Sequence, residues 1–187
     1  MNSSKTIAVL CGSLRKESYN RALVRALPAL APEGMEFTPL DGLDDLPHYN
    51  ADIQAEGFPP KVAELAAAIA TADGVAIVSP EYNYSIPGFL KNALDWLSRM
   101  QPVPFAGKPV LIQSVSPGIF GGARMQYHLR QVLVFLDALP MNRPEVMIGG
   151  AMQKFSDDGK LTDEPTRKFI ADQLKAFAAF IDRVGPR

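Results

Sequence analysis

The sequence contains few of the side chains that usually hold metals or form covalent cross-links. Its 187 residues include one cysteine, Cys11, and two histidines, His48 and His128. A single cysteine excludes a disulfide within the chain, and zinc sites draw most of their ligands from cysteine and histidine. We therefore expect no metal site.

The sequence also lacks a dominant charge and a long hydrophobic run. The formal net charge is −1, which favours neither a nucleic-acid partner nor the strongly acidic surface of an electron carrier. No apolar run reaches the roughly 18 to 20 residues of a membrane span, and the start, MNSSKTIAVLCGS, has no secretion-signal pattern. We expect a cytoplasmic protein that contacts neither nucleic acid nor membrane.

The remaining composition is that of a globular protein, with 47% hydrophobic and 21% charged residues. The length predicts a single domain over residues 1–187. Continuous apolar runs indicate three strands buried on both faces, at residues 6–11, 74–79 and 108–114. Weaker strand patterns lie at residues 36–40 and 145–149. Helical patterns separate the strands, at residues 20–30, 60–69, 88–100, 122–139 and 164–184.

Five strands alternating with five helices predict an α/β fold, a three-layer α/β/α sandwich around a five-stranded parallel sheet. Two strand orders fit this pattern, 2-1-3-4-5 or half of a Rossmann fold. Five strands in one chain favour the order 2-1-3-4-5, the flavodoxin-like arrangement. Residues 41–60 show no regular pattern and are expected to form a long surface loop.

Three connections carry unusual residues. They are GSLRKESYN at residues 12–20 (loop 1), PEYNYSIPG at residues 80–88 (loop 2) and SVSPGIFGGAR at residues 114–124 (loop 3). Each follows a predicted central strand. In the order 2-1-3-4-5 the chain leaves strands one and three in opposite directions, which opens a ligand-binding crevice at their carboxyl ends. Loops 1 and 2 are therefore expected on the walls of that crevice, with loop 3 beside them.

Loop 1 has the donors of a phosphate site. Ser13, Ser18 and Asn20 supply neutral donors, Arg15 supplies a charged fork, and a helix N-terminus follows, where unpaired N–H groups attract anions. The loop matches neither the dinucleotide-binding G-x-G-x-x-G pattern nor the G-x-x-x-x-G-K-[ST] loop. The alternative is that Ser18 or Asn20 only caps the helix.

Loop 2 combines rigid, flat and polar groups. Pro80 and Pro87 stiffen it, Tyr82 and Tyr84 offer flat faces, and the backbone together with the side chains of Glu81 and Asn83 offers polar edges. Such a loop suits a planar heterocycle, although the tyrosines could equally pack in the core. The glycines of loop 3 allow close backbone approach to a ligand, or form only a flexible turn. A phosphate site beside a ring site predicts FMN as the ligand.

At these residues the chain resembles the NADPH-dependent FMN reductase family of flavodoxin-like proteins, and within it the bacterial quinone and chromate reductase branch. The resemblance rests on residues 12–23, 79–99, 107–138 and the Met141-Asn142 turn. It implies non-covalent FMN, with Ser13, Arg15, Ser18 and Asn20 around the phosphate. The residues implied near the ring are Pro80, Glu81, Tyr82, Asn83 and Ser116.

The expected activity is that of an NAD(P)H-dependent FMN-containing reductase. Hydride passes from NADPH or NADH to flavin N5 and then to quinones, with chromate and azo dyes as further candidate acceptors. The cofactor supplies this chemistry, so no catalytic side chain is expected. The alternatives are a reductase that releases reduced FMN to a monooxygenase and a flavodoxin-type electron carrier.

The helix pattern at residues 122–139 is apolar on more than one face, with Met125, Leu129, Val132 and Leu136 on one stripe and Leu133, Val134 and Phe135 on others. A helix that is apolar all round is expected to be buried all round. An outer helix of a sandwich achieves this only against another subunit. We therefore expect at least a homodimer, and the resemblance implies a homotetramer, with Arg124, Tyr127 and Glu145 as candidate interface residues.

Overall fold

The computed structural model describes residues 4–185 and alternates strands with helices. The strands are β1 (Lys5–Cys11), β2 (Met35–Pro39), β3 (Gly74–Val78), β4 (Pro109–Val115), β5 (Leu139–Pro140) and β6 (Val146–Ile148). The helices are α1 (Tyr19–Leu30), α2 (Ala51–Glu56), α3 (Pro60–Thr71), α4 (Gly88–Leu97), α5 (Ala123–Phe135), a 3-10 turn at Ala151–Gln153 and α6 (Glu164–Val184).

All strand pairs are parallel, and the strand order is β2-β1-β3-β4-β5, which confirms the predicted 2-1-3-4-5 arrangement. Every residue of β3 and β4 is buried, as expected for strands covered on both faces. The predicted number of strands is wrong, because the fifth position is divided. Among residues 4–185, β5 pairs with the start of β4 and β6 pairs with its end, at Gln113–Val115. Pro140 ends β5, and Pro144 lies between β5 and β6. A proline has no N–H to donate to a neighbouring strand, so these two residues interrupt the strand.

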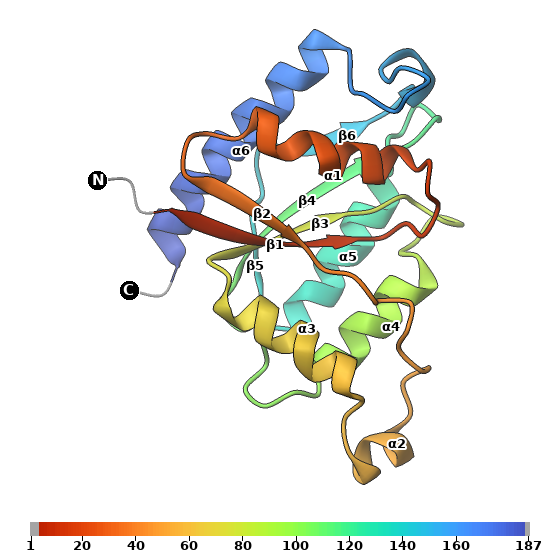
Figure 1. Ribbon diagram of the computed structural model, residues 1–187, viewed down its shortest axis with the longest axis vertical. Coiled ribbons are helices and arrows are strands. Elements are labelled where there is room, and N and C mark those ends of the chain that lie inside the picture. Colours follow the sequence, from red (N-terminus) through yellow and green to blue (C-terminus); the bar gives the residue numbers. More distant parts are fainter. Residues whose placement is uncertain (1–3, 186–187) are drawn as a thin grey trace.

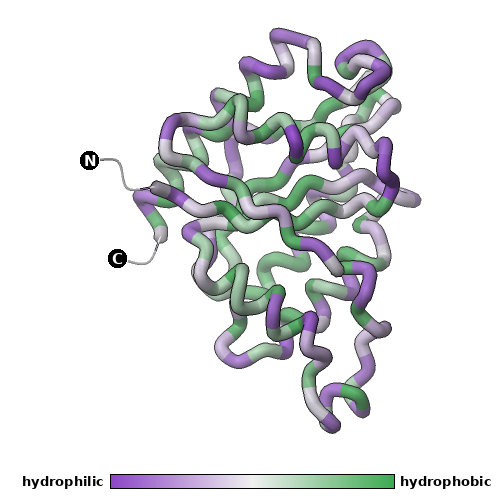
Figure 2. Tube along the Cα trace, viewed as in Figure 1, coloured by the Kyte–Doolittle hydropathy of each residue, from purple (hydrophilic) through white to green (hydrophobic). Residues whose placement is uncertain are grey.

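The helices cover both faces of the sheet, which confirms the three-layer sandwich (Figure 1). Helices α1 and α6 pack on one face with Ile7, Val9 and Leu111. Helices α3, α4 and α5 pack on the other face with Ala8, Leu10 and Ile112. The alternation of side chains along each strand divides the core in this way, and Figure 2 shows the hydrophobic residues concentrated along the central strands.

In the single chain the helix predicted at residues 122–139 is buried on one face only, and the prediction that a second subunit buries the rest stays a prediction. Helix α5 ends at Phe135, and its Met125, Leu129 and Leu133 pack against the sheet. Val134 and Phe135 point away from the sheet, with exposed fractions of 75% and 72%. Only one stripe of a helix can face the sheet, so the second apolar set remains at the surface.

Residues 41–60 differ from the predicted irregular loop, whereas the last helix matches its prediction. Residues 41–60 are not wholly irregular, because Asn50 caps the short helix α2 through a side-chain hydrogen bond to the N–H of Asp52 at 2.9 Å. The last helix, α6, has the predicted bounds and buries Ile170, Leu174 and Phe177. Within residues 4–185, no helix is both long enough and apolar enough to cross a membrane.

Candidate functional site

The three loops emerge side by side from β1, β3 and β4, at the carboxyl edge of the sheet (Figure 1). Loops 1 and 2 touch at their bases, because a Cβ on Gly12 would collide with the side chain of Ser79. Only glycine permits this approach of the two strand ends. The sheet therefore fixes where loops 1 and 2 begin.

Loop 1 presents a row of free backbone donors. Within residues 4–185, the N–H groups of residues 14–17 have no hydrogen-bond acceptor. Ser18 caps α1 by accepting from the N–H of Asn20 at 3.1 Å, which leaves its hydroxyl hydrogen available to a ligand. Ser13 is buried, and its carbonyl accepts from Arg21 Nε at 3.1 Å. Successive free N–H groups before a helix N-terminus, with the exposed Arg15 beside them, suit a phosphate.

Asn20 has a different position from the other phosphate candidates. Its buried carboxamide donates from Nδ2 to the carbonyl of Val115 at 3.0 Å and accepts from the N–H of Val115 at 3.0 Å. These two bonds leave one Nδ2 hydrogen for any ligand. Asn20 thus links the start of α1 to the end of β4 and holds loops 1 and 3 in register.

Loop 2 is a tight hairpin rather than an open connection. Tyr82 and Ser85 exchange backbone hydrogen bonds of 3.1 and 2.9 Å. The two central residues, Asn83 and Tyr84, have φ values of +49° and +69°, as in a type I′ turn. The left-handed conformation costs a tyrosine about 1 kcal/mol. Strain of this kind concentrates at ligand sites, and the N–H groups of residues 81, 83 and 84 have no acceptor in the described part of the chain.

Glu81 and Arg124 connect loop 2 to α5. The Glu81 carboxylate accepts from the backbone N–H of Arg124 at 3.0 Å and of Met125 at 3.2 Å, which caps the helix. The Arg124 guanidinium lies 4.0 Å from the centre of the Tyr84 ring and 4.4 Å from that of Phe120. This cation–π contact joins loop 2 to loop 3. The carboxylate of Glu81 therefore binds the N-terminus of α5.

Loop 3 lies close against β4 and β6. Gly121 and Gly122 have φ values of +58° and +88°, and a Cβ on Gly122 would lie 2.7 Å from Ser114 Cβ. Ser116 accepts from the N–H of Gly118 at 3.1 Å, which closes a turn. The N–H groups of residues 119, 120 and 122 have no acceptor within residues 4–185. Loop 3 therefore adds a third set of donors at the same edge.

The sequence patterns did not identify two segments near the loops. Gly149 packs against loop 3, since a Cβ on Gly149 would come within 2.5 Å of the Ile119 carbonyl oxygen. In the sequence, the paired glycines after the last strand are the signal for this contact. Residues 152 and 155–159 form, with residues 15–19, a cavity of about 490 Å³ next to loop 1. No local pattern distinguishes that segment.

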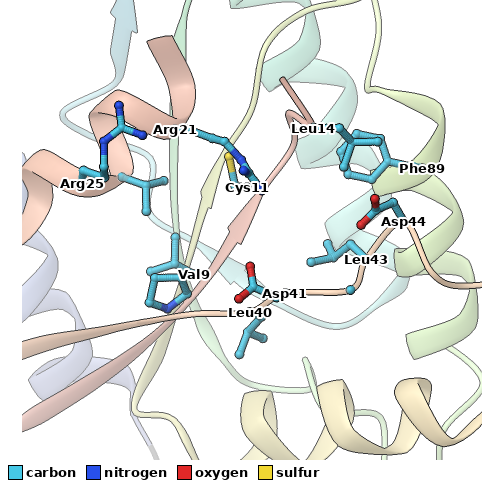
Figure 3. Close-up of a pocket in the computed structure, with 13 residues that line it drawn as sticks. Val9, Cys11, Leu14, Arg21, Arg25, Leu40, Asp41, Leu43, Asp44 and Phe89 are labelled. Carbon is cyan, nitrogen blue, oxygen red and sulfur yellow. The ribbon is translucent and has the colours of Figure 1, made fainter. Parts of the chain in front are cut away.

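A second cavity, of about 220 Å³, lies on the other side of loop 1 (Figure 3). Cys11, Leu14 and Phe89 line it, and Figure 3 shows the Arg21 guanidinium beside the Cys11 thiol. Burial raises the pKa of the Cys11 thiol, and the nearby Arg21 only partly offsets this effect. A thiol with a raised pKa is a poor nucleophile. Among the described residues, no group of three or more histidine, cysteine, aspartate or glutamate side chains could hold a metal ion.

The donor sets fit a flavin mononucleotide. Free N–H groups and hydroxyls in loop 1 match a phosphate, and free N–H groups on loops 2 and 3 match the polar edge of a ring. The phosphate donors and the ring donors lie on adjacent loops of one sheet edge. Residues able to hold this cofactor are thus present in the positions that the fold reserves for ligands.

Comparison with known proteins agrees with the expected cofactor. The family model described as NADPH-dependent FMN reductase matches residues 6–153. The quinone reductase of Escherichia coli (strain K12) is 54% identical over 187 residues, covering 98% of this chain and 99% of the relative. The flavoenzyme NAD(P)H:(acceptor) oxidoreductase from Paracoccus denitrificans superposes with a TM-score of 0.88 at 39% identity, covering 97% of this chain and 100% of that chain.

A more distant solved structure concerns the fold alone. The flavodoxin, WrbA-like protein from Agrobacterium tumefaciens superposes with a TM-score of 0.62 at 13% identity, covering 97% of this chain and 99% of that chain. The flavodoxin-like fold predicted from the strand pattern is thereby confirmed.

Proposed function

The chain belongs to the NADPH-dependent FMN reductase family, and from this premise we propose that it is an FMN-dependent NAD(P)H:quinone oxidoreductase. The observation that carries the proposal is the convergence of three sets of free backbone donors on loops 1, 2 and 3 at one edge of the sheet. The quinone reductase of Escherichia coli and the NAD(P)H-dependent flavoenzyme of Paracoccus denitrificans support the same reaction class.

Loop 1 holds the FMN phosphate in this proposal. Ser13, Arg15 and Ser18 bind it together with the free N–H groups, and Asn20 contributes its remaining hydrogen while anchoring the helix. Pro80, Glu81, Tyr82, Asn83 and Ser116 border the ring. When bound, FMN supplies the chemistry of accepting hydride from a nicotinamide and passing reducing equivalents to a second substrate.

In this proposal the backbone of the loops stabilises charge on the ligand ring, and side chains hold the loops in place. The free N–H groups of loops 2 and 3 present the positive ends of their dipoles, which stabilise negative charge on a ligand ring. The bonds from Glu81 to α5 hold loop 2 in one position relative to loop 3. No side chain is assigned a covalent or acid–base role.

Flat quinones are the proposed acceptors because an aromatic ring can stack on an exposed flavin. Chromate and azo dyes remain further candidates. The net charge of −1 is far from the strongly acidic balance that is typical of an electron carrier, which disfavours that role. Tight FMN binding would distinguish the proposed oxidoreductase from a reductase that releases FMN as a product.

We also propose that the protein is a homodimer or homotetramer. The exposed Val134 and Phe135 on α5 form an apolar surface at which a second copy could pack. Tyr127 lies 3.4 Å from Glu145 at the edge of this helix, and both side chains could take part in polar contacts between copies.

Anaerobic mixing of the FMN-loaded protein with NADPH tests the proposed reaction. We expect the flavin absorbance to bleach without any partner protein and to return when a quinone is added. A flavin that stays oxidised with both NADPH and NADH would contradict the proposal. A flavin that bleaches and then dissociates would instead support the FMN-releasing alternative.

A further inference from the structure

Two glutamines are buried completely in the sheet region, Gln126 on α5 and Gln113 on β4. We propose that Gln126 is a positioning residue for FMN binding, acting through Ser114 and the Gly121–Gly122 peptide of loop 3. The proposal rests on the FMN-dependent function proposed above. It extends that function to a residue that lies beneath the site and touches none of the proposed ligand-binding side chains.

The orientation of the Gln126 carboxamide is set by its neighbours. Nε2 donates to the Val146 carbonyl at 2.8 Å and to Ser114 Oγ at 2.8 Å. A backbone carbonyl can only accept, so the NH₂ side of the carboxamide must face Val146. The same NH₂ group then occupies an acceptor site on the Ser114 hydroxyl. Gln126 thereby connects α5 to both β4 and β6.

This contact determines where the Ser114 hydroxyl directs its own hydrogen. Because Ser114 Oγ accepts from Gln126, its hydrogen is available to the Gly121 carbonyl, to which it is hydrogen-bonded. The resulting chain runs in one direction from Gln126 through Ser114 to Gly121. Each bond in such a chain polarises and strengthens the next.

The Gly121 carbonyl in turn orients the following N–H group. The Gly121–Gly122 bond is trans, and in a trans peptide the C=O and the N–H point in opposite directions. Holding the Gly121 oxygen on Ser114 therefore directs the Gly122 N–H away from the buried hydroxyl. That N–H has no acceptor among residues 4–185, so it is available to a ligand at loop 3.

Gly122 packs closely against Ser114. A Cβ there would lie 2.8 Å from Ser114 Oγ, so the loop already packs directly on the hydroxyl.

The Gln126 Oε1 atom is itself buried without a hydrogen-bond partner in the described structure, which is unfavourable for the fold. An apolar side chain would avoid that cost but could not direct the Ser114 hydroxyl.

Gln113 provides a matched control. It is equally buried, its Oε1 is also without a partner within residues 4–185, and its Nε2 donates to Gln173 Oε1 at 2.8 Å. Its side chain faces α6, whereas Ser114 and Gln126 face each other on the opposite side of the sheet. A Gln113→Met variant thus loses one buried hydrogen bond, against two in Gln126→Met, and the lost bond joins β4 to α6 rather than to loop 3.

The experiment compares Gln126→Met, Ser114→Ala and their double variant with Gln113→Met. Apo protein is titrated with FMN by fluorescence quenching, and the backbone order of residues 118–122 is measured by NMR relaxation before FMN is added. We expect Gln126→Met and Ser114→Ala each to weaken FMN binding about tenfold and to loosen residues 118–122. The double variant should lose little more FMN affinity than the single variant with the larger loss, because both changes break the same chain of hydrogen bonds.

Gln113→Met should retain the FMN affinity and the loop order of the unmodified protein. The inference is overturned if Gln126→Met behaves like Gln113→Met, or if the losses from Gln126→Met and Ser114→Ala add fully. If Gln126→Met fails to fold, Ser114→Ala tests the chain of hydrogen bonds alone, since it removes a single hydroxyl. Unchanged FMN affinity and loop order in Ser114→Ala would then overturn the inference. Absence of FMN binding by the unmodified protein would instead overturn the proposed function itself.

Discussion

The Glu81 carboxylate accepts the backbone N–H of Arg124 at 3.0 Å and lies 3.4 Å from the Arg124 guanidinium, across 43 residues of sequence. One acidic side chain thus caps α5 and fixes the hairpin of loop 2 against loop 3. The cap stabilises the helix, and the same contact sets the distance between two walls of the proposed flavin site.

Replacing Glu81 should therefore affect both stability and cofactor binding. We expect Glu81→Ala to lower the free energy of unfolding by about 1 kcal/mol, as for loss of a helix cap, and to weaken FMN binding. Thermal unfolding of the apo protein and FMN titration measure the two effects. Glu64→Ala is the control, since Glu64 is exposed and pairs only with Lys61 among the described residues. Unchanged FMN affinity in Glu81→Ala would contradict a role in positioning loop 2.

The glycines of loop 3 are required by close packing as well as by backbone conformation. Gly122→Val places a Cβ 2.7 Å from Ser114 Cβ at a φ of +88°, so we expect purified protein with little bound flavin. Gly107→Val tests the conformational effect alone, because Gly107 has a φ of +68° and a Cβ added there would meet no described atom within 4 Å. That control should lose about 1 kcal/mol of stability and keep its flavin. Equal flavin content in the two variants would rule out a specific role for Gly122.

The Cys11 thiol should react slowly with alkylating reagents in the native protein. Burial raises its pKa, so at any given pH a smaller fraction is thiolate than in the unfolded chain. The alkylation rate of native protein should therefore begin to rise at a higher pH than the rate of urea-unfolded protein. Mass spectrometry of timed iodoacetamide reactions measures both rates. A native rate equal to or above the unfolded rate at neutral pH would show that the thiol is activated.

The exposed end of α5 gives a test of self-association. Phe135→Lys introduces a charge into the apolar surface formed with Val134, which should shift the protein towards smaller species. Light scattering coupled to size-exclusion chromatography reports the mass. Lys substitution of the exposed Ile53, on α2, should leave the mass unchanged. A monomeric unmodified protein at micromolar concentration would contradict the proposed assembly.

The parts of the fold that sequence could predict are those with a local cause. Burial could be predicted directly from the apolar runs of β1, β3 and β4 and from the apolar stripe of α6. The three-layer arrangement follows from the alternation of strands and helices along the chain. The division of the last strand position was missed because two short pieces pair with different parts of β4. The inward position of Leu133, which the sequence pattern grouped with the exposed Val134 and Phe135, could not be inferred either, since hydrophobicity alone does not reveal which stripe faces the sheet.

The same distinction applies to the candidate site. The three loops were recognisable because each follows a buried strand and carries unusual residues. The roles of Asn20 and Glu81 were not, because their partners Val115 and Arg124 lie 95 and 43 residues away. Contacts over such separations depend on the assembled sheet. Sequence therefore predicted which loops form the proposed site but could not separate residues that face a ligand from residues that hold the loops.

The central claim is that loops 1, 2 and 3 together bind FMN, and an NMR titration of the apo protein with FMN tests it most directly. Backbone amide signals of residues 13–17, 81–84 and 119–122 should shift together and saturate at one FMN per chain. Shifts confined to other residues, or no shifts at saturating FMN, would contradict the account.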